Sequence, residues 1–82
     1  TYTQFLNELG ELVGTLPPFA ENHSALKELY KVMVLTRTFD KKAIALQRTG
    51  KMGTYAPVNG QEAISVAIGH AMKSEDVFIP YY

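Results

Sequence analysis

The sequence contains no cysteine and no excess of either charge, and its apolar runs are short. Without cysteine, the chain can form neither a disulfide nor a thiolate zinc site. Eight basic residues balance eight acidic ones, so no net field recruits nucleic acid or an anionic lipid surface. No run approaches the ~20 apolar residues that span a bilayer. The sequence therefore predicts neither nucleic acid nor a membrane as a partner.

A chain of 82 residues makes at most one small domain, and a domain of that size buries only about 60–65% of its unfolded surface. Its start has neither the basic residues nor the apolar stretch of a secretory signal peptide. The first residue is Thr1 rather than Met. We therefore expect a fragment of a longer protein.

The middle of the chain predicts one amphipathic helix of about 24 residues. Asn22 or Ser24 can cap its start, and Gly50 suits the left-handed position after its end. Most charged residues of this segment, among them Arg37 and Asp40, are expected on the polar face. The apolar face is formed by residues that recur at spacings of three and four, namely Leu26, Leu29, Tyr30, Met33, Thr36, Phe39, Ala43, Ile44 and Leu46.

The segment Gln4–Val13 allows two interpretations. Its apolar residues can share one face of a helix. Alternatively, Asn7–Gly10 has a turn residue at its start and glycine at its end, as in the type I turn that joins two short strands. We predict the hairpin, and Pro17-Pro18 ends either structure.

A loop follows the long helix, and Asn59 is expected to cap a second helix. Glu62 would then occupy the third helical position and bond back to the cap, as in a capping box. Small residues are frequent in this helix, which predicts that it is buried on most sides. The closing Val77–Tyr82 is rich in residues that favour strands. The expected fold is mostly α, with a long helix, a small-residue helix and a short terminal strand.

Few residues are candidates for chemistry. Gln61-Glu62 is a possible acid–base pair, but capping already explains the carboxylate. His23 and His70 lie far apart in the sequence without acidic neighbours at ligand spacing, so we predict no metal site and no catalytic residue in this segment. Residues 50–53 are too short for a phosphate-binding P-loop. Tyr81 and Tyr82 either cover a core or lie at the ligand-binding end of a strand.

Several motifs occur in a fixed order. The long helix carries Leu-Tyr, Met-Val-Leu-Thr-Arg and Phe-Asp, and Arg48-x-Gly50, Gly53–Pro57, Gly60–Ala63 and Glu75–Tyr82 follow. No single motif is diagnostic, but the ordered set resembles the α subunit of the thiamine-diphosphate-dependent component of 2-oxoacid dehydrogenase complexes, in its pyruvate dehydrogenase branch. The branched-chain 2-oxoacid and acetoin versions share these motifs. A small helical interaction module is the alternative of another class.

The resemblance implies that residues 1–82 are the N-terminal part of an α/β thiamine-diphosphate-binding subunit. Tyr82 matches the tyrosine of a Tyr-Arg pair that holds the cofactor's diphosphate, and the arginine would be the next residue. Thr54 falls in the substrate-pocket loop, where relatives often carry an aromatic residue. The magnesium-binding stretch and the activating glutamate of the β subunit would lie elsewhere. Residues 1–82 alone are therefore expected to be inactive.

The resemblance also implies partners and a location. The intact enzyme would be an α2β2 heterotetramer that decarboxylates pyruvate and passes the acetyl unit to a lipoyl group on an acyltransferase component. It would bind thiamine diphosphate and magnesium. It would be cytoplasmic in a bacterium and in the mitochondrial matrix of a eukaryote.

Overall fold

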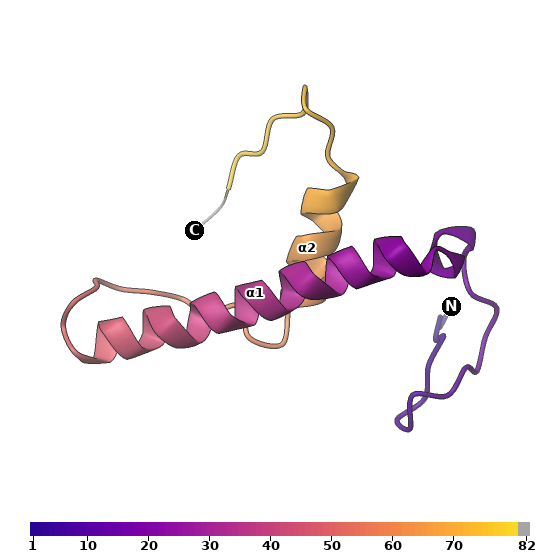
Figure 1. Cartoon of the computed structure of the whole chain (residues 1–82), viewed down its shortest axis with the longest axis horizontal. Helices are drawn as coiled ribbons and strands as arrows, with labels where there is room; N and C mark the ends of the chain where they lie inside the picture. The colour runs from indigo at the N-terminus through magenta and orange to yellow at the C-terminus, as the bar shows by residue number, and fades with distance from the viewer. Residues whose placement is uncertain (81–82) are drawn as a thin grey trace.

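A computed structural model describes residues 1–80 of the chain. These residues form a short 3-10 helix, η1 (Pro18–Glu21), and two α-helices, α1 (His23–Arg48) and α2 (Glu62–Ala71). Figure 1 shows α2 crossing α1 near the middle of α1, and the connecting loop (residues 49–61) returning along the C-terminal half of α1. The predicted mostly α fold is confirmed.

The long helix begins and ends where the sequence predicts. Asn22 is its N-cap, and its side-chain oxygen accepts a hydrogen bond from the Ala25 N–H at 3.2 Å. At the other end, Gly50 adopts φ 74°, the left-handed conformation that only glycine adopts without steric cost. The partly buried face of α1 follows a spacing of four and three through Leu29, Met33, Thr36, Asp40 and Ala43.

The N-terminal segment is a hairpin, as predicted, rather than a helix. Leu6 and Leu12 form an isolated antiparallel bridge, and the Gly10 N–H donates to the Asn7 carbonyl at 3.0 Å. The Asn7 side-chain oxygen accepts from the N–H groups of Leu9 and Glu11, each at 2.9 Å. This bonding of an asparagine side chain to the following backbone stabilises the turn.

The start of α2 differs from the prediction. Asn59 is not its cap: the N-cap is Gln61, without a side-chain capping bond, and Glu62 is the first helical residue rather than the third. The cause is a turn, in which the Gln61 N–H donates to the Val58 carbonyl at 2.8 Å. Gly60 occupies the third position of this turn with φ 89°, which is the conformation that a type II turn requires there. The turn delays the helix by two residues relative to the capping-box register.

Two further expectations are corrected. The small-residue helix is not buried on most sides in the described structure, since Ile64 is 64% and Ile68 is 52% exposed; only α1 packs against it. Residues 77–80 are not in a strand, because a strand needs a partner for its backbone groups and none pairs with them within residues 1–80. The remaining residues of the predicted strand, Tyr81 and Tyr82, lie outside the described residues.

Residues 1–80 are less compact than a globular domain of the same length. Their radius of gyration is 16.0 Å, against about 12 Å for a compact domain of this length. Within residues 1–80, the buried apolar residues are Ala20 and Ala43 alone. No helix in this part of the chain is long and apolar enough to cross a membrane. With so small an apolar core, polar bonds carry much of the connection between α1, the connecting loop and α2.

Candidate functional site

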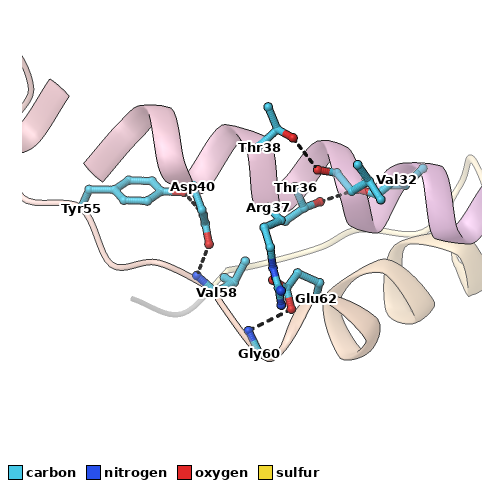
Figure 2. Close-up of polar contacts among 10 residues, drawn as sticks. Val32, Thr36, Arg37, Thr38, Asp40, Tyr55, Val58, Gly60 and Glu62 are labelled. Atoms are coloured by element: carbon cyan, nitrogen blue, oxygen red, sulfur yellow. Dashed lines mark hydrogen bonds and ion pairs between the residues drawn. The ribbon is translucent and has the colours of Figure 1, made fainter. Parts of the chain in front are cut away.

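Two buried carboxylates hold the connecting loop against α1 and α2. Asp40 and Glu62 are only 3% and 4% exposed, and Figure 2 shows both reaching toward the loop, Asp40 from α1 and Glu62 from the start of α2. Each carboxylate accepts one side-chain bond and one backbone N–H bond, so all four oxygens are used. Burial of a charged carboxylate is costly unless it is bonded in this way.

Asp40 binds the middle of the connecting loop. Its Oδ1 accepts a hydrogen bond from the Tyr55 hydroxyl, and its Oδ2 accepts one from the Val58 N–H at 2.8 Å. The ring of Tyr55 also meets Phe39 edge-on, with ring centroids 6.0 Å apart. Successive residues of α1, Phe39 and Asp40, therefore contact both the ring and the hydroxyl of one tyrosine.

Glu62 joins the two helices and the end of the loop. Its Oε1 accepts a charged hydrogen bond from Arg37 Nε at 2.6 Å, and its Oε2 accepts from the Gly60 N–H at 2.9 Å. The Arg37 side chain is half exposed, whereas that of Glu62 is 5% exposed. The expected bond from Glu62 back to the preceding backbone exists, although it goes to Gly60 rather than to a capping asparagine.

The electrostatics fix the charge state of Glu62. The bond from Arg37 and the backbone N–H bonds lower the pKa of Glu62 from 4.5 to about 2. Glu62 raises the pKa of Arg37 in return, and the bond to Asp40 raises the pKa of the Tyr55 hydroxyl. Near neutral pH, Glu62 is therefore an anion with no proton to donate, and it is too weak a base for general acid–base catalysis. The acid–base interpretation of Gln61-Glu62 has no support in this geometry.

The remaining sequence candidates lie apart from these bonds. Thr54 is an exposed residue of the connecting loop, directly before Tyr55. Tyr82, the residue expected to bind the diphosphate, lies outside the described residues. His23 is at the start of α1 and His70 near the end of α2. Among residues 1–80, no three side chains of metal-ligating type cluster.

Sequence reasoning missed Asp40 and Arg37, which it placed on the polar face of α1. One signal was present for Asp40, because it occupies the same spacing of four and three as Leu29, Met33 and Ala43. A carboxylate in an apolar register needs a bonding partner. The partners, Tyr55 and the Val58 N–H, lie 15 and 18 residues further on, so no helical periodicity identifies them.

Known proteins resemble this chain along nearly its whole length. It is 43% identical over 81 residues to the pyruvate dehydrogenase E1 component subunit alpha of Bacillus subtilis (strain 168) and to that of Bacillus cereus. The protein of the same name from Staphylococcus aureus (strain Mu50) is 40% identical over 81 residues. Each alignment covers 96% of this chain and 21% of the relative. The chain thus spans about a fifth of the length of these curated relatives.

No solved structure matches the chain significantly. A family model does: the dehydrogenase E1 component model matches residues 30–82. This range contains Arg37, Asp40, the whole connecting loop and α2. Since the match extends over more than half of the sequence, the chain belongs to the dehydrogenase E1 component family.

Proposed function

We propose that residues 1–82 are the N-terminal part of the α subunit of a pyruvate dehydrogenase. The intact enzyme oxidatively decarboxylates pyruvate and transfers the acetyl unit to a lipoyl group. The observation that carries this proposal is the 43% identity, over 96% of the chain, to proteins named as pyruvate dehydrogenase E1 component subunit alpha. Family membership by itself supports the coarser assignment to a 2-oxoacid dehydrogenase.

Thiamine diphosphate and magnesium are the cofactors that this family implies. The described residues do not fit a diphosphate site of their own, because the loop N–H groups of Val58 and Gly60 are already bonded to Asp40 and Glu62. The residues proposed to hold the diphosphate are Tyr82 and groups elsewhere in the intact subunit. When bound, thiamine diphosphate supplies the electron sink for decarboxylation.

The role of the described residues in this proposal is to shape the site. The connecting loop carries Thr54, which we propose lines the substrate pocket. Asp40 and Glu62 fix the loop at Tyr55, Val58 and Gly60. Threonine at position 54 is smaller than an aromatic residue and carries a hydroxyl, so it would leave more space in the pocket and influence which 2-oxoacid fits.

We further propose the assembly that the resemblance implies. Two α and two β subunits form the active enzyme, and the lipoyl-bearing acyltransferase accepts the acetyl unit. The exposed apolar residues of both helices, such as Leu35 and Ile64, are available for contacts in such an assembly. Because the named relatives are bacterial, we propose a cytoplasmic location.

The test is an activity assay of the full-length subunit purified together with its β subunit. We expect decarboxylation of pyruvate that requires both thiamine diphosphate and magnesium, and faster turnover of pyruvate than of branched-chain 2-oxoacids or acetoin. Residues 1–82 alone serve as the control, and we expect them to show no activity. Preference for a branched-chain 2-oxoacid or for acetoin would contradict the pyruvate assignment, while no turnover of any of these would contradict the enzyme assignment.

A further inference from the structure

The middle of the connecting loop has no backbone support of its own. Residues 52–57 form no backbone–backbone hydrogen bond with the rest of residues 1–80. The loop is tied to the helix end at Lys51, whose N–H donates to the Leu46 carbonyl at 2.9 Å, and to the turn that begins at Val58. The segment between these two points depends on side chains for its conformation.

Asp40 supplies that support. Its two oxygens bind the Tyr55 hydroxyl and the Val58 N–H, two points three residues apart, so one carboxylate fixes the second half of the unsupported segment, directly after Thr54. Phe39 adds an edge contact to the same tyrosine ring. Figure 2 shows Tyr55 and Val58 approaching Asp40 from the loop, with no other labelled residue between them and α1.

Asp40 is suited to hold the loop rigidly. It lies within α1, two turns before the helix ends at Arg48, and it is 3% exposed, so its backbone and its environment are both fixed. A helix-borne group with its full complement of bonds positions a neighbouring loop more accurately than a loop residue does. Both oxygens accept bonds from the loop, and the burial of the side chain leaves little access for substrate or cofactor.

We propose that Asp40 is a positioning residue of the substrate pocket, which it shapes by holding Tyr55 and Val58 and thereby placing Thr54. This inference rests on the proposed function, because it takes Thr54 as a pocket residue. Thr54 is covalently joined to Tyr55, so any shift of the tyrosine moves it. Without the Asp40 bonds, the loop at Thr54 and Tyr55 is held less firmly. A pocket lined by a more mobile loop discriminates less well between substrates that differ by one methylene.

The experiment measures substrate selectivity in the full-length α subunit assembled with its β subunit. The readout is kcat/KM for pyruvate divided by kcat/KM for 2-oxobutyrate, which is larger by one methylene. A role confined to folding lowers the amount of active enzyme equally for both substrates and leaves this ratio unchanged. The variants are Asp40→Ala, which removes both bonds, Asp40→Asn, which retains one acceptor and one donor, and Tyr55→Phe, which removes only the hydroxyl.

The matched control is Glu28→Ala. Glu28 is a carboxylate on the same helix, and its side chain is 69% exposed and pairs with Lys31 at 3.0 Å. We expect this variant to keep the wild-type ratio. One methylene in a pocket is discriminated by about 10- to 200-fold, so we expect Asp40→Ala to reduce the ratio roughly 5-fold or more. Tyr55→Phe and Asp40→Asn should each give a smaller reduction, because each leaves one or both loop contacts.

An unchanged ratio in both Asp40→Ala and Tyr55→Phe would overturn the inference, whether or not thermal stability falls. Should Asp40→Ala not fold, Tyr55→Phe decides alone: a reduced ratio supports the inference and an unchanged ratio overturns it. The activity of the wild-type assembly tests the proposed function separately. If the wild-type assembly turns over neither 2-oxoacid, the proposed function fails, and this inference fails with it before any variant is compared.

Discussion

Arg37 and Glu62 are 25 positions apart in the sequence, yet Arg37 Nε lies 2.6 Å from Glu62 Oε1. This ion pair joins the middle of α1 to the first residue of α2, and the second oxygen of Glu62 binds the Gly60 N–H. One carboxylate therefore connects α1, the end of the loop and the start of α2, at the point where α2 leaves the loop (Figure 1). Arg37 is half exposed, so water screens its charge. Glu62 is buried, so its charge is stable only because both oxygens accept hydrogen bonds.

The low pKa of Glu62 predicts a pH dependence of stability. Its pKa is about 2 in the folded chain and about 4.5 when unperturbed. Because the folded value is lower, the ionised Glu62 contributes stability above pH 4.5, and this contribution is lost as the pH falls from about 4.5 toward 2. We expect the stability difference between the wild-type full-length subunit and Glu62→Gln to be constant from pH 8 to about 5.5 and to shrink below that.

Denaturant unfolding of both proteins across this pH range measures the difference directly. The other partners of Glu62 do not titrate in this range, since Arg37 stays protonated and Gly60 contributes a backbone N–H. A difference that is independent of pH down to 3.5 would show that the charge of Glu62 contributes nothing.

Removal of Arg37 should lower the melting temperature more than removal of an exposed cation on the same helix. Arg37→Ala leaves the buried Glu62 without its charged partner, and we expect the full-length subunit to lose roughly 2–5 °C of melting temperature. Lys31→Ala breaks the exposed pair with Glu28, and we expect a change of about 1 °C or less. Differential scanning fluorimetry of both variants compares them. Equal losses would indicate that the Arg37 pair is no stronger than an ordinary surface pair.

The turn before α2 depends on the backbone freedom of Gly60. Gly60 has φ 89°, and a Cβ placed on it meets no atom within 4 Å, so substitution is opposed by backbone strain and not by a clash. We expect Gly60→Ala to destabilise the full-length subunit by about 1–2 kcal/mol. Gly53 also has open space but no positive φ, so Gly53→Ala should change stability by about 0.5 kcal/mol or less. Chemical denaturation distinguishes the two, and equal effects would contradict the role of the turn.

Tyr82→Phe tests the proposed diphosphate contact in the assembled enzyme. A hydrogen bond to a charged acceptor contributes about 1.5–3 kcal/mol, which corresponds to roughly 10- to 150-fold weaker thiamine diphosphate binding at about 1.4 kcal/mol per decade. Titration calorimetry of the cofactor-free assembly measures this. Tyr81→Phe is the control, because it removes the same hydroxyl from the neighbouring tyrosine, which is not the one that the resemblance assigns to the diphosphate. Weaker cofactor binding in Tyr81→Phe but not in Tyr82→Phe would show that Tyr81 makes the contact.

The sequence by itself determined the local structure of α1, because the signals at its two ends act over only a few residues. Asn22, one of two candidate caps, and Gly50 were recognisable as the two ends of α1, because a cap bonds within the next few residues and a left-handed glycine follows the last turn. For residues 4–13 the sequence left a helix and a hairpin open, and the turn residues Asn7 and Gly10 supported the hairpin that the structure shows. The motifs from Leu29 onward also identified the family, since their order and spacing need no three-dimensional information.

Only the tertiary structure decided which polar residues are buried. In the sequence, Asp40 is one of several charged residues of a helix. Its role is evident only in the folded chain, where the loop places Tyr55 and Val58 within hydrogen-bonding distance of its carboxylate. The start of α2 was likewise set by the turn at Gly60, not by the asparagine that favoured an earlier cap. Residues 77–80 have strand propensity and no strand, because a strand, unlike a helix, satisfies its backbone groups only through a partner distant in sequence.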